Sequence, residues 1–570
     1  MRRFGVTAIV AVVSVALAMV TGVGAGAQTT TPLPVNDTGV GKPPPGSGLG
    51  TKAALENPKC TADAVKGYGM FGFVTATGGP FCVAPAPADN GGATARGVTA
   101  TSIKVVVVVP NAAQVAAGKA AGAVAPINSA TGGTGTIENA FRDAWAAYAH
   151  VFETWGRTVD LTFITSSGGD EAAQRADAIT VEQEKPMFVV DATSTGLGTM
   201  ATVLGHDKYV VLSYATTTKD ATAQAPYRWG NSDPNAIATN AAQFIGAQLA
   251  KGKAEFAGDS AMQSQPRKFG AIVPGNIDTP AFLAALKKQG VTLATPPLNY
   301  TANGSPLGDP VTAQTEAPLI IAKLKSAGIT SVIMFTDIGM TGALTKVAAT
   351  QEYRPEWVMT GYGYQDISLL ARTSYDQDEW SHAFGIGNLN PVIRSANIAT
   401  TLTDWYWGPK TATTDPVTGN SVGWLAAAIQ YAGPDLTPQN VQRGFFSVPA
   451  EFGAASNDPG SIQVAWGKTA GLPNPSYFTR GSDFAAVWYD GKTTGESQVY
   501  PTVGKGVTWF TGNGKRYSAG TWPKKPMGFF KKTGSLYAFA TPPVPPNPTI
   551  PCDGCPSSGA PGKPSAASSN

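Results

Sequence analysis

The stretch Ile103-Lys104-Val105-Val106-Val107-Val108-Val109-Pro110 is an almost unbroken run of β-branched residues that ends at a proline. A strand with one solvent-exposed face alternates apolar and polar residues, whereas a strand buried on both faces has a continuous apolar sequence. The run therefore predicts a fully buried strand of a parallel sheet. Parallel strands are joined by crossovers, usually helices, so helices are expected between the strands.

The following residues repeat this alternation of helix and strand. Strands are predicted at 159–164, 187–190 and 209–212, and a helix at 170–185. A further amphipathic helix, ended by Gly156, is predicted from apolar residues at spacings of three and four: Ile137, Phe141, Trp145, Tyr148, Phe152 and Trp155. The series favours a parallel sheet with helices on both faces.

The same alternation of helices and strands begins again after Asn235 and predicts a second doubly wound sheet. Its helices are expected at 236–251, 279–289 and 317–327, and its strands at 269–273, from Val291 onward, and at 330–335. Two junctions match, Leu286-Lys287-Lys288-Gln289-Gly290 and Leu324-Lys325-Ser326-Ala327-Gly328. Lysine complements the carboxyl end of a helix, and glycine supplies its left-handed cap.

The amino terminus has the three-part pattern of a secretory signal peptide. Arg2 and Arg3 precede a charge-free, mostly apolar run, and small residues end at Ala27. The alternative is a membrane anchor, but the run of about 15 residues is shorter than the roughly 20 that span a bilayer. We expect cleavage after residue 27 and an extracytoplasmic chain without a membrane span.

The four cysteines fit an oxidising compartment. Two local disulfides, Cys60–Cys82 and Cys552–Cys555, are the simplest pairing. Residues 28–96 are expected to form an irregular arm that contains the first disulfide loop, and 541–570 a Pro/Ser-rich tail. The Cys552-Asp553-Gly554-Cys555 spacing is also typical of a redox motif or half a zinc site, but no strand or helix flanks it.

Charge and motifs exclude several function classes. The chain carries 41 basic and 38 acidic residues, and loss of Arg2 and Arg3 leaves 39 against 38, which gives no electrostatic case for nucleic acid or anionic membranes. No Walker loop or His-Glu-x-x-His motif occurs, and His150, His206 and His382 lie far apart. We expect no enzyme activity, cofactor or metal. A hydrolase built on two distant carboxylates stays open, although nothing selects such a pair.

Polar turns follow the expected strands. In open parallel sheets, ligands bind beyond the carboxyl ends of the strands, where hydroxyls, amides and helix amino termini gather. The alternative role for each Ser or Thr is a helix N-cap, which does not exclude ligand contact. The candidate ligand-binding residues are Asn111, Ser194, Thr195, Ala215, Thr216, Thr217, Asn276, Asp278, Asp337, Tyr362 and Tyr364.

The order of these elements resembles the type I periplasmic binding proteins, specifically the branched-chain amino acid (Leu/Ile/Val) substrate-binding subunits of ABC transporters. The resemblance covers roughly residues 97–540. Its carriers are the lead-in Gly97-Val98-Thr99-Ala100-Thr101-Ser102-Ile103, the turns Val190-Asp191-Ala192-Thr193-Ser194-Thr195 and Ser213-Tyr214-Ala215-Thr216-Thr217, Tyr227-Arg228-Trp229-Gly230-Asn231-Ser232-Asp233 and Asp483-Phe484-Ala485-Ala486-Val487-Trp488.

The resemblance implies an α/β fold of two doubly wound parallel-sheet lobes joined by three crossovers. Lobe one would comprise residues 97–234 and 380–477, and lobe two residues 235–379 and 479–540. It also implies that the chain captures a small polar or amphipathic molecule between the lobes for an ABC permease. Of the candidates, Ser194, Thr195, Ala215, Thr216 and Thr217 match the family's carboxylate-binding turns.

The expected acidic partner for a ligand ammonium does not carry over. Where the resemblance implies an acidic residue after Thr360-Gly361, this chain has Tyr362-Gly363-Tyr364. Asp337 or Asp278 is a possible substitute, or the ligand has no ammonium group. Trp380, Trp405 and Trp407 either line an aromatic pocket or pack in a core. An exported sensor or scaffold with this fold is the alternative to a transport role.

Overall fold

The valine run forms β1 (Ser102–Val109), the second strand of a five-stranded parallel sheet. The order is β2-β1-β3-β4-β5. Val105, Val107 and Val109 belong to one apolar cluster and Val106 and Val108 to another, so both faces of β1 are covered, as the sequence predicts. The other strands are β2 (Thr158–Thr165), β3 (Phe188–Asp191), β4 (Val210–Leu212) and β5 (Arg228–Trp229).

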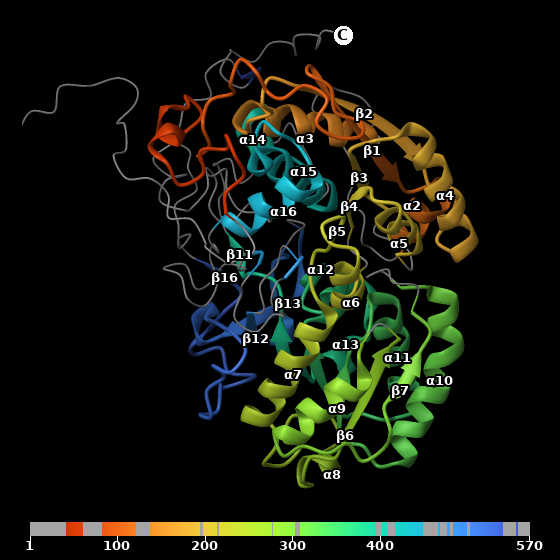
Figure 1. Cartoon of the computed structure of the whole chain (residues 1–570). Coiled ribbons are helices and arrows are strands. Elements are labelled where there is room, and N and C mark those ends of the chain that lie inside the picture. The colour runs from red at the N-terminus through yellow and green to blue at the C-terminus, as the bar shows by residue number, and fades with distance from the viewer. Residues whose placement is uncertain are drawn as a thin grey trace, which may run out of the picture.

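Figure 1 shows a computed structural model with two lobes, one above the other. The structure describes residues 42–60, 82–120, 137–193, 198–213, 216–275, 277–302, 308–393, 402–407, 416–448, 465–467, 476–478, 483–498, 502–539 and 555–556. The predicted signal peptide and almost all of the predicted tail lie outside these ranges. No helix among the described residues is both long and apolar enough to cross a membrane.

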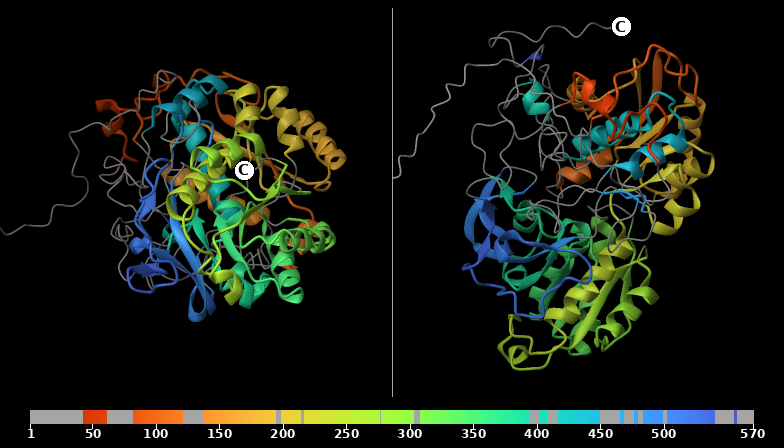
Figure 2. Two further views of the ribbon diagram at one scale, coloured as in Figure 1. Left: turned by 90° about the horizontal axis from the view of Figure 1, so that it is seen from below. Right: turned by 60° about the vertical axis from the view of Figure 1, so that its left-hand side comes forward.

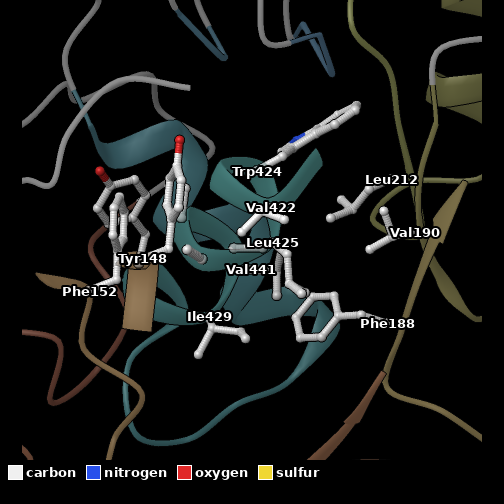
Figure 3. Packing of buried hydrophobic residues seen from close by; sticks show 14 of the residues in the cluster. Tyr148, Phe152, Phe188, Val190, Leu212, Val422, Trp424, Leu425, Ile429 and Val441 are labelled. Atoms are coloured by element: carbon white, nitrogen blue, oxygen red, sulfur yellow. The ribbon is translucent and has the colours of Figure 1, made fainter. Parts of the chain in front are cut away.

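The core of lobe one is built from two distant parts of the chain (Figure 3). Leu425 and Ile429 of α15 (Pro416–Ala432) pack between Tyr148 of α3 (Ile137–Val151) and Phe188 of β3. Figure 2 shows the same return of the cyan helices to the orange and yellow lobe. The other helices of this lobe are η1 (Lys52–Glu56), α2 (Ala112–Ala120), α4 (Glu171–Glu184), α5 (Thr199–His206), α6 (Thr218–Ala223), α14 (Leu402–Trp407) and α16 (Pro438–Ser447).

Lobe two contains a sheet in the order β15-β13-β12-β10-β9-β8-β6-β7, with β14 (Arg516–Tyr517) paired to β12. Its parallel strands are β6 (Phe269–Pro274), β7 (Leu298–Tyr300), β8 (Ser331–Met334), β9 (Glu356–Thr360) and β10 (Ala383–Gly387). The predicted second parallel sheet is confirmed, and an antiparallel part that was not predicted from the sequence extends it. β12 (Phe484–Glu496) is antiparallel to β10 and forms a hairpin with β13 (Val503–Thr511), to which β15 (Ser535–Leu536) adds.

Helices cover both faces of this second sheet. One face packs on α7 (Pro234–Gln248) and α9 (Thr279–Lys288), and the other on α10 (Pro310–Ser326) and α11 (Ile338–Thr350). The remaining elements are α8 (Ser260–Gln263), η3 (Tyr362–Tyr364), α12 (Ser368–Ser374), α13 (Gln377–Trp380), η4 (Gly512–Gly514) and the pair β11 (Val392–Ile393) and β16 (Ala538–Phe539).

The strand expected from Val291 is absent, because Val291 completes the end of α9. Its N–H donates to the Leu286 carbonyl at 3.0 Å, and Gly290 has a φ of 76°. The next strand, β7, begins only at Leu298. The matching junction at Gly328 has the same bonds, so the predicted glycine caps are confirmed. The predicted first amphipathic helix ends earlier than expected, at Val151.

The expected return to lobe one at residue 380 comes too early. β10 pairs in parallel with β9, so lobe two continues through Gly387. The close pairing of β10 with β9 requires glycine at position 385, because a Cβ there would collide with the Met359 backbone. Trp380 is fully buried and meets Tyr375 edge-on at 4.7 Å. It is therefore a core residue and not part of an aromatic pocket.

The predicted Cys60–Cys82 disulfide is confirmed, with the two Cα atoms 5.0 Å apart. The arm around it packs on lobe one: the Lys59 ammonium donates to the Phe152 carbonyl at 2.7 Å, and Leu49 and Val83 join the core. Cys555 is also disulfide-bonded, but its expected partner Cys552 lies outside the described residues.

Three crossovers connect the lobes, and a buried arginine holds two of them. Arg516 donates to the carbonyls of Asn388 and Leu389, where the chain leaves β10, at 3.3 and 2.9 Å. It also pairs with Asp483, which precedes β12, with Nε and Oδ2 3.2 Å apart. Arg516 and Asp483 are both almost fully buried. The first crossover pairs with the third through Gly230 and Phe478.

Replacing Arg516 by Met is expected to lower the free energy of unfolding of lobe two by about 3 to 5 kcal/mol, because Asp483 is left as an uncompensated buried charge. Urea denaturation followed by tryptophan fluorescence measures this loss. The matched control is Arg175→Met, which removes an exposed ion pair with Glu171 and is expected to change stability by less than about 0.5 kcal/mol. We call Arg516, Asp483 and the carbonyls of Asn388 and Leu389 the clamp. Equal unfolding midpoints for the two variants would contradict a stabilising role of the clamp.

Candidate functional site

The first crossover joins the carboxyl edges of the two parallel sheets. Helices of such sheets run opposite to their strands, so each helix begins at the carboxyl edge. β5 ends at Trp229 and α7 begins at Pro234, so only residues 230–233 join the carboxyl edge of lobe one to that of lobe two. Four residues span at most about 14 Å. β10 ends and β12 begins at the same edge, because Gly387 pairs with Ala485.

Asn111 follows β1 and caps α2. Its Oδ1 accepts the Gln114 N–H at 3.0 Å, and the Gln114 Oε1 accepts the Asn111 N–H at 2.8 Å. The Asn111 amide also donates to the carbonyl of Ser166, after β2, at 3.1 Å. The side chain thus ties the carboxyl ends of β1 and β2 together. An amide has two N–H groups and two lone pairs, so ligand contact stays a prediction.

Thr216 and Thr217 follow β4 next to the first crossover. The Thr217 hydroxyl caps α6, accepting the Asp220 N–H at 3.1 Å. The adjacent Thr218 hydroxyl donates to the carboxylate of Asp233, whose pKa is raised by burial. Because Asp233 also caps α7, this bond links the lobe-one turn to the first helix of lobe two. Ser194, Thr195 and Ala215 lie outside the described residues.

Asp337 and Tyr300 meet at the carboxyl edge of lobe two. The Asp337 carboxylate caps α11 by accepting the Met340 N–H at 2.8 Å, and the Asp337 N–H donates to the Tyr300 hydroxyl at 3.1 Å. Burial raises the Asp337 pKa to about 6, although the bonds from Met340 and Tyr300 oppose this change. Only 3% of Asp337 is exposed, so its carboxyl group is a weak candidate for an ammonium.

A braced turn carries Tyr362 and Tyr364 beside Asp337. The buried Gln365 accepts the Thr360 N–H at 3.2 Å and donates to the Thr336 hydroxyl at 3.0 Å, which joins the ends of β9 and β8. Gly363 has a φ of 63°, and a Cβ there would lie 2.6 Å from the Thr336 carbonyl oxygen. The close approach therefore requires glycine. Both tyrosines are half-buried.

Asp278 lies apart from this group as an exposed cap of α9. Its carboxylate accepts the Ala281 N–H at 2.9 Å, and its own N–H donates to Asn235 at 2.8 Å. Asn276 lies outside the described residues. The structure thus brings Asp337, Tyr362 and Tyr364 together, while Asp278 caps the neighbouring helix.

Sequence reasoning missed two residues at this edge, Tyr300 and Asp366. Asp366 follows the tyrosine turn and is fully buried. Its Oδ2 accepts the Leu389 N–H at 2.7 Å, and its Oδ1 has no hydrogen-bond partner. Burial raises its pKa, and the charge of Arg516 opposes that shift. The position of Asp366 between the polar turn and an apolar helix was a signal in the sequence. It could not identify the partners of Asp366, because the clamp is assembled from distant segments.

Two aromatic candidates remain after the assignment of Trp380 to the core. The Trp407 indole N–H donates to the Asp143 carbonyl at 2.9 Å, so this ring is fixed against α3. The side chain of Trp405 lies outside the part of the chain that can be described. No group of three metal-ligating side chains occurs among the described residues.

No protein-family model matches the chain, and no curated protein matches its sequence. Solved structures with a similar arrangement include a solute-binding protein of an ABC transporter from Rhodopseudomonas palustris HaA2 in complex with p-hydroxybenzoic acid, at 14% identity, covering 73% of this chain and 97% of that one, with a TM-score of 0.45. A Leu-, Ile-, Val-, Thr- and Ala-binding protein from Brucella ovis in its closed conformation has 11% identity, coverages of 75% and 98%, and a TM-score of 0.47. A fatty acid ABC transporter substrate-binding protein from Thermomonospora curvata has 12% identity, covers 76% of this chain and 96% of its own, and has a TM-score of 0.45.

The raised pKa of Asp337 predicts a pH-dependent stability difference. A carboxyl group with a raised folded-state pKa stabilises the fold at low pH and loses that contribution as the pH rises through about 6. Asp337→Asn keeps a capping side chain, so its stability relative to wild type should increase by up to about 3 kcal/mol between pH 4 and 7.

Thermal unfolding at pH 4, 5, 6 and 7 measures the effect. Asp337→Ala serves as the control for the cap: it should show the same pH dependence with an added constant loss of about 1 kcal/mol. A stability difference between wild type and Asp337→Asn that does not change with pH would refute a buried, titrating Asp337.

Proposed function

We propose that this protein is an extracytoplasmic solute-binding protein that captures a small polar or amphipathic molecule between its lobes without changing it chemically. One observation carries the proposal. The first crossover joins the carboxyl edges of the two sheets, the second leaves lobe two at that edge and the third enters it there, so the polar turns of both sheets lie beside the crossovers. Ligands of open α/β sheets bind at such edges.

The chemistry of the edges supports a ligand with one polar anchor and a flatter, less polar body. Lobe one contributes amide and hydroxyl groups from Asn111, Thr216 and Thr217, with Ser194, Thr195 and Ala215 as further candidates. These are neutral groups that suit a carboxylate or hydroxyl. Lobe two contributes the half-buried rings of Tyr362 and Tyr364, which suit an apolar body.

The proposal favours a solute without an ammonium group. Asp337 is held by a helix cap, Asp278 caps the exposed end of α9, and the free oxygen of Asp366 is buried at the clamp. None of the three is an open carboxylate beside the tyrosine turn, and an unpaired buried ammonium would be costly. Organic acids and alcohols therefore rank above amino acids as candidate solutes.

An ABC permease is the proposed partner, because a cleft that closes on a solute creates a surface that exists only in the loaded form. A sensor or scaffold is the second candidate. It draws support from the disulfide-closed arm, which packs on α3 through Lys59 and lies outside both sheets. Co-purification with a membrane permease separates the two, since only the transport role requires it.

Native mass spectrometry of the purified protein, followed by a thermal-shift screen of organic acids, alcohols and amino acids, tests the proposal. We expect at least one solute to raise the melting temperature. Tyr362→Ala should weaken its binding by about 10-fold or more, since loss of a buried aromatic contact costs roughly 1.4 kcal/mol or more. Lys323→Ala on the exposed face of α10 is the matched control and should leave affinity unchanged. Absence of any stabilising solute, or equal binding by both variants, would reject the cleft as the site.

A further inference from the structure

A cavity of about 670 Å³ lies in lobe two, at the end opposite the crossovers. It is open to solvent and is lined by the segment after α7, by α13 and the residues that follow it, by β12, and by Lys505, Phe530 and Lys532. His382, in its wall, immediately precedes β10 and therefore marks the amino edge of the parallel strands. α7 begins at the first crossover and runs away from the cleft, and Figure 1 shows the following helix α8 at the far tip of lobe two.

The floor of this distal cavity is aromatic. The rings of Phe256 and Phe530 lie 4.9 Å apart, and Phe530 lies 5.4 Å from Trp488. Trp488 is stacked on Trp509, with their rings 5.7 Å apart and nearly parallel, so it is held in place. Phe256 and Phe530 are only half-buried and line the cavity. The cavity therefore has a rigid apolar floor, and its volume is typical of small-molecule sites.

His382 supplies a neutral acceptor in the wall. Its Nδ1 lies 2.9 Å from the Phe256 carbonyl oxygen, which can only accept, so Nδ1 carries the proton. Burial lowers the pKa of His382, which leaves Nε2 unprotonated near neutral pH. A Cβ on Gly258 would lie 2.7 Å from that nitrogen, so the glycine provides the space that the ring occupies.

Charges at the rim balance. Glu255, Asp378 and Asp490 face three lysines at positions 492, 505 and 532. The Lys532 ammonium lies 3.1 Å from the Asp490 carboxylate and donates to Thr493 at 2.8 Å, so this pair is already satisfied. An anion or a cation would gain little from such a rim. A neutral ligand rich in hydroxyls could bond to both the donors and the acceptors.

We propose that this distal cavity binds a neutral carbohydrate. Sugar hydroxyls pair with the rim carboxylates, lysines and His382 Nε2, while the C–H face of the ring packs on the aromatic floor, whose π-face carries partial negative charge. Because the cavity and the cleft lie at opposite ends of lobe two, a glycan bound at one leaves the other open. The site could thus hold the exported protein on an envelope polysaccharide while the cleft cycles.

Isothermal titration with cellotriose, maltotriose and triacetylchitotriose, each to about 10 mM, tests the proposal on the full-length protein. We expect at least one to bind with a dissociation constant below about 1 mM. His382→Asn keeps a donor for the Phe256 carbonyl but has no acceptor at the position of Nε2, and should weaken binding about 10-fold. The exposed rim variant Asp378→Ala should weaken it about 3-fold without affecting folding. Lys323→Ala is the unaffected control.

Tyr362→Ala in the cleft separates this site from the solute site. It should leave saccharide binding unchanged, even if the cleft proposal fails. Failure of all three saccharides to bind, binding that Tyr362→Ala abolishes and His382→Asn does not, or selective binding of short charged peptides would each overturn the carbohydrate site.

Discussion

The buried guanidinium of Arg516 is the interaction on which the two-lobed arrangement depends. It joins the backbone of Asn388 and Leu389 to the carboxylate of Asp483, so the point where the second crossover leaves lobe two lies beside the point where the third enters it. Asp366 accepts the Leu389 N–H from the other side. A charge buried this deeply is stable only with complete partners, which restricts the crossover backbone to one arrangement. Movement between the lobes is then confined to the segments beyond the clamp.

The same constraint explains why lobe one needs two pieces of chain. β1 buries both of its faces, and one of them is covered by α15, which the chain reaches only after passing through lobe two. The lobes therefore cannot separate by a simple break of one linker. A ligand that bridges the polar turns at Thr217 and Tyr362 would bring the lobes together against the stiffness of the three crossovers. Part of its binding energy would therefore be used to close the cleft.

Local rules predicted most of the fold and less of the site. The valine run, the alternating elements and the Gly290 and Gly328 caps depend on neighbours in sequence, and these predictions are confirmed. The pairing of β10 and the antiparallel β12–β13 hairpin depend on contacts between distant segments, so the lobe boundary at residue 380 was wrong and the hairpin was not predicted. Asp337 and Tyr362 were found because they follow strands. Arg516 and Tyr300 carry no such signal, because their partners lie far away in sequence.

The central claim is that the carboxyl edges of the two sheets border a cleft that closes on a solute. Arg175 of α4 and Lys323 of α10 are exposed, and these two helices lie on the same side of the molecule in different lobes (Figure 1). Spin labels at Arg175→Cys and Lys323→Cys report the distance between the lobes by pulsed electron resonance. The distance is predicted to shorten, with a narrower distribution, when the solute found by thermal shift is added. An unchanged distance distribution at saturating solute would contradict the claim.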